Sequence, residues 1–100
     1  MIIYNVTIKI HSDIEGEWLN WMRNKHIPDV MATGQFTESR ISRLLDQPQE
    51  EDPTFIVQYH CESMDKINHY IEHFAPPLRD EFNERYKGRF VLFRTLMEVM

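Results

Sequence analysis

Apolar and polar residues alternate along the start of the chain, from Ile2 to Ile10. This period of two is typical of a β-strand with one apolar and one polar face. A second alternating run at residues 54–61 predicts another strand of the same kind. Weaker patterning at residues 35–46 and the aromatic-rich stretch at 89–99 add two more strands. The last strand is predicted to be buried on most of both faces.

The first segment between the predicted strands carries apolar residues at helical spacing. Ser12 and Glu15 form a capping-box pattern that predicts a helix start at Asp13. We expect the helix to end or kink at Pro28, because proline lacks an amide donor and restricts the residue before it. A short turn should follow and close at Gly34, since glycine tolerates the left-handed backbone of a helix end.

A second helical segment follows the third predicted strand. Ser63 is positioned to cap its first turn. Pro76 and Pro77 are expected to stop that helix and to start another, which ends at Gly88. The stretch at residues 47–53 is polar and contains two prolines, so it is predicted to be an exposed hairpin connection.

The resulting order is βαββαβ, the split βαβ arrangement of the ferredoxin-like fold in the α+β class. Right-handed crossovers would place the helices on one face of a four-stranded antiparallel sheet, with the first and third strands in its centre. The other face would expose Ile3, Ile56 and half of the last strand, so we expect a homodimer through this open face. The chain has 100 residues, and we expect a single domain over residues 1–100.

Composition and charge exclude several classes of partner. The formal net charge is -5, and no run of Lys or Arg is present that could neutralise adjacent phosphates, so nucleic-acid binding is disfavoured. No apolar segment approaches the roughly 20 residues that span a bilayer, so no membrane association is expected. Cys61 is the only cysteine, which excludes an internal disulfide and suits the cytoplasm. Phosphate loops and dinucleotide fingerprints are absent from the sequence, and we predict no cofactor.

The stretch EWLNWMRNKHIPDVMATGQF at residues 17–36, together with both terminal strands, resembles a small bacterial family classed as a domain of unknown function. The chain as a whole resembles the dimeric α/β-barrel superfamily, in which two ferredoxin-like protomers join their sheets. That superfamily includes cofactor-free monooxygenases, isomerases, haem enzymes and ligand-binding regulators, so the fold does not choose a function. The resemblance implies a ligand site between the helices and the sheet of each protomer.

Several side chains are candidates to line such a site, because their periodicities turn them toward the layer between helices and sheet. The residues that we expect to bind a ligand are Tyr4, Trp21, His26, Tyr59 and Arg94. Trp18 and Met22 lie on the same helix face and are expected to pack. In the alternative interpretation, all of the aromatic residues belong to an ordinary core.

The two most polar candidates each have a second interpretation. His26 is a weak candidate for a general base, since a neutral imidazole can take up a proton or orient a polar ligand. Alternatively, His26 caps the helix by hydrogen bonding to its last carbonyl groups. Arg94 is expected to bind an anionic group of a ligand, or else to pair with Glu98.

Two further groups of residues are of types that can bind a metal or act as a nucleophile. His69 and His73 have the i, i+4 spacing of metal ligands, but they are expected to face solvent without a third ligand, and no metal site is predicted. Cys61 is expected to be a small buried residue.

Polar residues on the central strands should lie side by side on the sheet face away from the helices. There they would form hydrogen bonds across the dimer seam or line a polar cavity inside the barrel. These residues are Asn5, Thr7, Gln58 and His60.

Three functions from different classes follow from these features. The protein binds a small, partly aromatic molecule in each protomer; or it is a cofactor-independent monooxygenase or isomerase in which His26 or a tyrosine moves a proton; or it is a structural dimer without a ligand.

Overall fold

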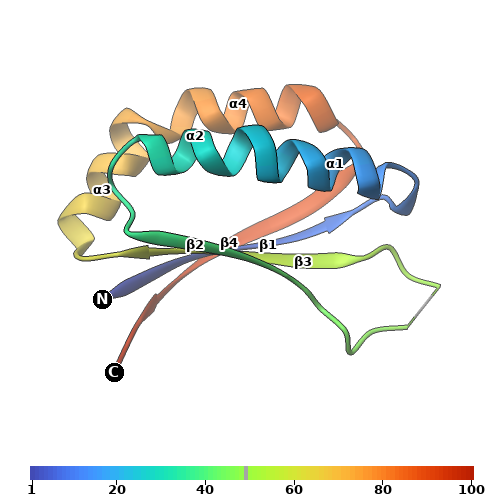
Figure 1. Ribbon diagram of the computed structural model, residues 1–100, viewed down its shortest axis with the longest axis horizontal. Coiled ribbons are helices and arrows are strands. Elements are labelled where there is room, and N and C mark those ends of the chain that lie inside the picture. The colour runs from blue at the N-terminus through green and yellow to red at the C-terminus, as the bar shows by residue number, and fades with distance from the viewer. Residues whose placement is uncertain (49) are drawn as a thin grey trace.

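The structure is a computed structural model that describes residues 1–48 and 50–100. Gln49, which belongs to the predicted hairpin connection, lies outside the described residues. Figure 1 shows one layer of helices above a sheet, with both ends of the chain at the same end of that sheet. Among the described helices, none has the length and apolar character needed to cross a bilayer.

Four strands form a single antiparallel sheet. They are β1 (Ile2–Ile10), β2 (Glu38–Arg43), β3 (Thr54–Cys61) and β4 (Phe90–Glu98). Their spatial order is β2-β3-β1-β4, which confirms that the first and third strands occupy the centre. Only β2 differs clearly in length, because it is shorter than the predicted 35–46. In the central pair, Tyr4 lies opposite Tyr59, and both alternate onto the same face as the other buried residues of their strands.

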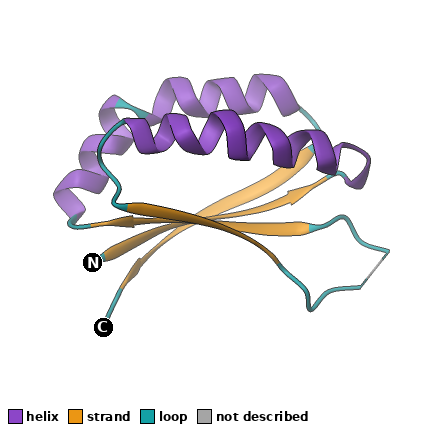
Figure 2. Ribbon diagram, viewed as in Figure 1, coloured by secondary structure: helices purple, strands orange, loops and turns teal. Residues whose placement is uncertain are grey.

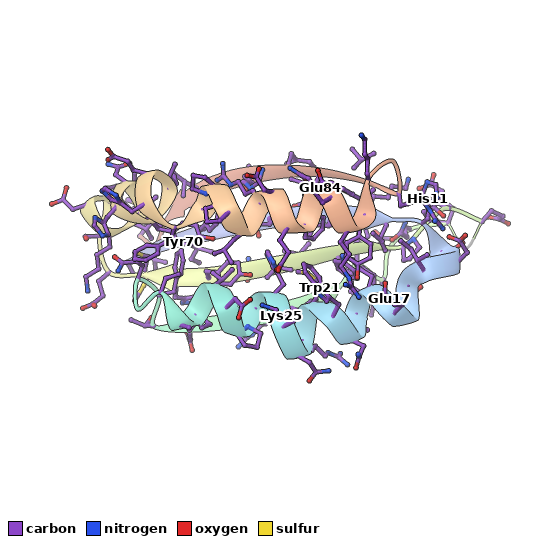
Figure 3. All side chains as sticks on the ribbon, turned by 90° about the horizontal axis from the view of Figure 1, so that it is seen from above. His11, Glu17, Trp21, Lys25, Tyr70 and Glu84 are labelled. Carbon is purple, nitrogen blue, oxygen red and sulfur yellow. The ribbon has the colours of Figure 1, made fainter. Side chains whose placement is uncertain are left out.

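The helices all cover one face of this sheet, as Figure 2 shows. They are α1 (Glu15–Trp21), α2 (Ile27–Ala32), α3 (Met64–His73) and α4 (Ala75–Tyr86). Seen from above, the continuous α1 to α2 segment and α4 run side by side over the sheet (Figure 3). This arrangement confirms the predicted ferredoxin-like α+β fold.

Three of the predicted helix boundaries are confirmed by their local geometry. The Ser63 hydroxyl accepts a hydrogen bond of 3.3 Å from the Lys66 amide at the start of α3. Gly34 and Gly88 have positive φ angles of 78° and 75° just after α2 and α4. Both glycines adopt the left-handed backbone that ends a helix at little steric cost.

The start of the first helix differs from the prediction. A 3-10 turn at Ser12–Ile14 precedes α1, and neither start has a side-chain cap. The Ser12 amide donates a hydrogen bond of 3.0 Å to Asp52 Oδ1. The Glu15 carboxylate pairs with Arg43. The capping-box prediction is therefore wrong, because partners distant in sequence take both groups.

Pro28 does not end the first helix. A π-helical turn at Met22–His26 joins α1 to α2 without a break, and Pro28 lies in the first turn of α2. A proline ring clashes with the carbonyl one helical turn before it, and a locally wider turn relieves that clash. The predicted stop at Pro28 is therefore replaced by a change of helix type.

The two faces of the sheet differ in composition and burial. The face under the helices carries the alternating residues of β1 and β3, all of them buried. The opposite face of β4 is open, with Val91 70% and Phe93 59% exposed in the single chain. The prediction that β4 is buried on most of both faces is wrong for the single chain, whereas the prediction that the face away from the helices exposes half of the last strand is confirmed. Among the described elements, none covers the outer face of β4.

Candidate ligand-binding site

A cavity lies between the helices and the sheet. Its free volume is about 30 Å³, enough for one or two water molecules, so a larger molecule would fit only if lining side chains moved aside. Its lining comes from the π-helical turn, from α2, α3 and α4, and from the strands β1, β3 and β4. Its lining residues are Tyr4, Val6, Ile8, Met22, His26, Val30, Val57, Tyr59, Tyr70, Leu78, Arg79, Phe82, Leu92 and Arg94.

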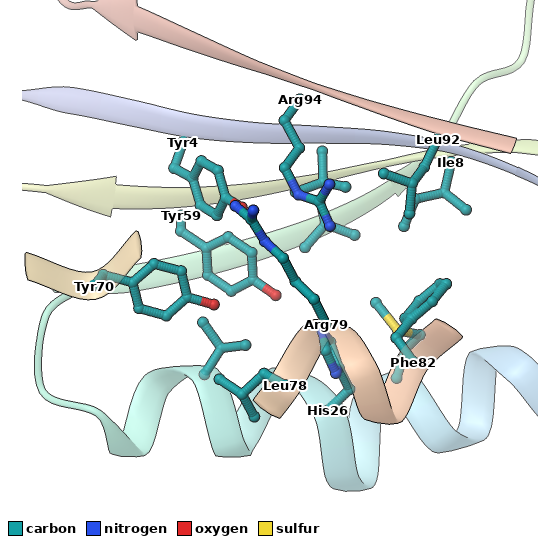
Figure 4. A pocket seen from close by; sticks show the side chains of 14 residues that line it. Tyr4, Ile8, His26, Tyr59, Tyr70, Leu78, Arg79, Phe82, Leu92 and Arg94 are labelled. Atoms are coloured by element: carbon teal, nitrogen blue, oxygen red, sulfur yellow. The ribbon is translucent and has the colours of Figure 1, made fainter. Parts of the chain in front are cut away.

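Aromatic rings form one end of the cavity. Tyr4 from β1 and Tyr59 from β3 lie side by side, with ring centroids 5.9 Å apart. Tyr70 from α3 tilts against Tyr4 at 5.8 Å, and Phe36 stacks on Tyr4 at 5.9 Å and contacts Tyr70 at 4.8 Å. Figure 4 shows the hydroxyl groups of Tyr59 and Tyr70 directed into the same space. The cavity therefore combines an apolar aromatic wall with polar tips.

Burial keeps these tyrosine hydroxyls protonated. Removal from water raises the pKa of Tyr59, and the neighbouring Tyr70 and Tyr4 raise it further. Burial also raises the pKa of Tyr70 together with the effect of Tyr4, although the positive charges of Arg79 and Arg94 oppose the shift. Both hydroxyls therefore remain neutral hydrogen-bond donors at physiological pH.

The π-helical turn explains why His26 faces the cavity. Trp18, Met22, His26 and Val30 are spaced four residues apart, and in a regular α-helix each step of four would rotate the side chain by about 40°. A wider turn cancels part of this rotation, and Met22, His26 and Val30 all line the cavity. The local change of helix type thus positions the histidine.

His26 is neutral in this environment. Burial lowers its pKa from 6.5 to about 4; Asp29 acts against this shift, whereas the charges of Arg94 and Lys25 add to it. Its Nδ1 atom is buried and has no hydrogen-bond partner among the described residues. The alternative role as a helix cap is not observed, because His26 makes no side-chain cap hydrogen bond where α2 begins.

Trp21 does not line the cavity, contrary to our expectation. Its ring is buried and stacks behind His26, with centroids 5.1 Å apart, and it also contacts Phe82 and Tyr86. The guanidinium of Arg85 covers it from outside at 5.3 Å. Figure 3 shows Trp21 on the helix layer away from Tyr70. Trp21 lies one residue before Met22, which faces the cavity together with His26 and Val30. The Trp21 ring therefore points away from the cavity and packs against the imidazole of His26.

Arg94 faces the cavity because of its register. It lies opposite Val6 across β1 and β4, and Val6 belongs to the buried face of its strand. The expected alternative was an ion pair with Glu98. Within residues 1–48 and 50–100, no carboxylate oxygen lies within 4.0 Å of the Arg94 guanidinium.

Arg79 also lines the cavity, and sequence reasoning missed it. From α4 its Nη2 donates a hydrogen bond of 3.0 Å to the Tyr4 hydroxyl, as Figure 4 illustrates. Its Nε is buried without a hydrogen-bond partner in the described part of the chain. A signal was available, since Arg79 precedes Phe82 by three residues and Tyr86 by seven. This spacing places a charged residue on the apolar stripe of the helix.

The other candidates lie away from the cavity. His69 and His73 are both exposed on α3, with ring centroids 4.4 Å apart. The described residues contain no group of three potential metal ligands. Cys61 is fully buried, and its thiol donates to the carbonyl of Gln35 at 3.3 Å.

The polar residues of the central strands lie on the open sheet face, as predicted. Asn5 pairs with Gln58 in the register of β1 and β3. Its side-chain amide donates to the hydroxyls of Thr7 and Thr95, each at 3.2 Å. His60 Nδ1 lies 3.0 Å from a carboxylate oxygen on the neighbouring edge strand. These groups form part of the second sheet face and do not contribute to the cavity.

A family model matches residues 1–100, and its description is a domain of unknown function, DUF4286. The chain belongs to this family. No curated protein matches this DUF4286 chain. The family assignment confirms the resemblance carried by the residue 17–36 stretch and adds no activity to it.

Solved structures share the fold at low sequence identity. An ethyl tert-butyl ether d (EthD) family protein from Bacillus halodurans has 11% identity and a TM-score of 0.70, with 100% of both chains covered. SnoaB, a cofactor-independent oxygenase from Streptomyces nogalater, has 9% identity and a TM-score of 0.68 over 99% of this chain and 92% of its own. The Arabidopsis thaliana protein At3g17210 has 13% identity and a TM-score of 0.73, covering 100% and 96%. This DUF4286 chain therefore shares the ferredoxin-like α+β fold of these solved structures.

Proposed function

We propose that this protein binds a small, partly aromatic molecule in the cavity between its helices and its sheet. Three buried polar side-chain atoms have no partner in the described residues: Trp18 Nε1, which lies outside the cavity lining, and the two that carry the proposal, His26 Nδ1 and Arg79 Nε. Both belong to side chains that line the cavity. An unpartnered buried polar atom costs about 1–3 kcal/mol, so it is rare unless the site serves another purpose.

A ligand would offset this cost. Its oxygen or nitrogen atoms would supply the missing partners once the cavity had opened through movement of lining side chains such as half-buried Leu78 and exposed Arg94. An aromatic ring of the ligand would pack against Tyr4, Tyr59 and the aliphatic residues of the cavity, where ring contacts add to the area buried. This combination of an apolar wall with a few convergent polar groups is typical of small-molecule sites.

Mass spectrometry of the purified protein, extracted under denaturing conditions, tests the proposal. Leu78 lines the cavity and is half-buried, so the Leu78→Trp variant should fill the cavity without replacing a core residue. The same small molecule is expected in extracts of the wild type and of the control Leu78→Ala, but not of Leu78→Trp. A wild type with no bound molecule, whose melting temperature no small aromatic compound raises, would contradict ligand binding.

A cofactor-independent monooxygenase or isomerase is the second candidate. It is favoured by His26, a neutral imidazole on the cavity wall, and one protein of similar fold is described as a cofactor-independent oxygenase. Proton transfer is most efficient when the pKa of the base is near the working pH, and the pKa of His26 is about 4. Binding is therefore the better-supported function. Oxygen consumption or substrate isomerisation that His26→Gln abolishes would reverse this ranking.

We also propose that two chains pair through the open face of the sheet. Val91, Phe93 and Met97 expose apolar surface on this face, beside the half-buried Ile3 and Ile56. Exposed contiguous apolar surface of this kind is typical of an association site. We expect a homodimer by sedimentation at micromolar concentration, whereas a monomer would contradict the pairing. A cytoplasmic location remains a prediction based on the single buried Cys61.

A further inference from the structure

We propose that the ligand of this cavity is an aromatic carboxylate whose carboxylate group is held between Arg79 and Arg94. The inference rests on the proposed ligand-binding function and assigns a chemical class to the ligand. Two guanidinium groups from opposite sides, one on α4 and one on β4, face the same space (Figure 4). The planar fork of an arginine matches the geometry of a carboxylate better than that of an uncharged group.

The charge around the cavity supports an anionic ligand. Two arginines line it, while no Asp or Glu is among the lining residues in the part of the chain that the structure describes. The whole protein has a formal net charge of -5, so this positive charge is local and runs against the overall balance. Two like charges at one site repel each other unless an anion lies between them.

Neither arginine has a carboxylate partner to neutralise it. Over residues 1–48 and 50–100, no salt bridge within 4.0 Å involves Arg79 or Arg94. The other arginines near the helix layer differ, since Arg85 pairs with Glu17 at 2.6 Å and Arg89 pairs with Asp13 at 2.7 Å. Acidic residues are thus available on the surface, and they pair with outward-facing arginines.

The two arginines contribute differently to the site. Arg79 is half-buried and oriented by its hydrogen bond to the Tyr4 hydroxyl, and its remaining donors include the unpartnered Nε. Arg94 is exposed and can adjust to the position of a bound group. The protonated hydroxyls of Tyr59 and Tyr70 face the same space and can donate to a carboxylate oxygen as well. The anion would therefore meet hydrogen-bond donors on several sides.

The apolar lining of the rest of the cavity matches the aromatic part of such a ligand in character, and the ring would enter if half-buried Leu78 and exposed Arg94 moved aside. Below the arginines the wall is built from aliphatic side chains and the faces of Tyr4 and Tyr59. A ring attached to the carboxylate would occupy this region, while the charged group remained near the more exposed Arg94. The arrangement separates a polar end from an apolar end, as an amphipathic ligand requires.

Calorimetric titration with matched probes tests the assignment. The probes are benzoate and naphthoate, each compared with its uncharged carboxamide, which has nearly the same shape. The variants are Arg79→Gln and Arg94→Gln, with Arg79→Lys to separate charge from fork geometry. Arg23→Gln is the matched control, because Arg23 is exposed on the outer helix surface and its substitution removes the same unit of charge.

We expect the wild type and Arg23→Gln to bind the carboxylates about 10- to 100-fold more tightly than the carboxamides, the preference typical of charge-assisted hydrogen bonds. This ratio should fall toward one in each Gln variant and take an intermediate value in Arg79→Lys, while carboxamide binding changes little. Equal affinity of the wild type for both probe types would overturn the carboxylate assignment and leave the ligand-binding proposal intact. No binding of either type would contradict both.

Discussion

The two faces of the sheet are both incomplete, but in different ways. The face under the helices is covered by aromatic and aliphatic packing, but its cavity holds polar groups that lack partners in the described part of the chain. Two guanidinium groups there have no carboxylate partner, and one buried imidazole nitrogen has no hydrogen bond. On the open face the polar residue Asn5 is satisfied by Thr7 and Thr95, and the deficit is apolar surface on β4. A small anionic ligand suits the first face, and a second protein chain suits the other.

This contrast has a physical origin in the edge strand β4. Its inner row contributes Leu92 and Arg94 to the cavity, whereas its outer row contributes Val91, Phe93 and Met97 to the open face. Successive residues of a strand point to opposite faces, so one short segment serves both surfaces. Substitutions on the two rows should therefore separate association from ligand binding.

The largest expected effect is the loss of the dimer in Ile56→Asp. Ile56 lies on the open face opposite Thr7 and Ser42, and a buried unpaired charge there would cost roughly 3–5 kcal/mol, once in each protomer of a symmetric pair. Sedimentation equilibrium should show a dimeric wild type and a monomeric variant. Asn83→Asp, which adds a charge to the exposed surface of α4, is the control and should remain dimeric. A dimeric Ile56→Asp would place the interface elsewhere.

A loss of folding stability is expected for Trp18→Ala on the helix-covered face. Trp18 has 0% exposure and packs on Phe55 with ring centroids 4.9 Å apart. Removal of this side chain should lower the free energy of unfolding by about 3–5 kcal/mol through lost burial and a cavity. Urea titration measures the change. A loss below about 1 kcal/mol would mean that the layer between helix and sheet collapses around the missing ring.

The contrast between the faces also shows how far the sequence could be interpreted. Period-two alternation predicted β1 and β3 because one face of each strand is buried, and the register then placed Arg94 opposite Val6 on the cavity side. The apolar composition of β4 suggested burial on both faces, but the outer face of β4 is exposed in the single chain, as the predicted topology required. A hydrophobic pattern alone does not distinguish residues buried within one chain from residues that another molecule covers.

The remaining errors come from interactions that local patterns do not contain. Ser12 and Glu15 match a capping box, but Asp52 and Arg43 are nearer partners in the folded chain. The π-helical turn depends on a proline two residues beyond it and on the fit of the helix to the sheet. Trp21 was misplaced for a different reason: it precedes Met22, which faces the cavity, and its own ring packs behind His26.

Protonation of His26 should lower stability in mildly acidic solution. Its pKa is about 4 in the folded protein and 6.5 in the unfolded chain, so the unfolded state takes up the proton first as the pH falls. The contribution of neutral His26 to the free energy of unfolding is fully present above pH 6.5. It decreases by about 3 kcal/mol in total as the pH falls from about 6.5 to 4.

Urea titrations across this pH range measure the effect as a difference between the wild type and His26→Gln. The variant lacks the titrating group and should show a flatter profile, whereas His73→Gln, which removes an exposed histidine, should follow the wild type. Parallel profiles for the wild type and His26→Gln would show that the imidazole remains accessible to water. With a bound carboxylate the decline should be smaller and should end at a higher pH, since a nearby anion favours the imidazolium and raises the pKa of folded His26 toward 6.5.

The smallest expected effect is a gain in stability for Arg79→Gln. The substitution removes a half-buried charge with an unpartnered Nε and its repulsion with Arg94, at the cost of the hydrogen bond to Tyr4. These contributions nearly cancel, and we expect the free energy of unfolding to rise by up to about 1 kcal/mol. Arg85→Gln is the contrasting control, because loss of its exposed pair with Glu17 should lower stability slightly. Urea titration of the ligand-free proteins measures whether the free energy of unfolding rises in Arg79→Gln and falls in Arg85→Gln. A loss of more than about 2 kcal/mol in Arg79→Gln would mean that Arg79 is retained for folding, whereas a gain would fit a residue retained for what it binds.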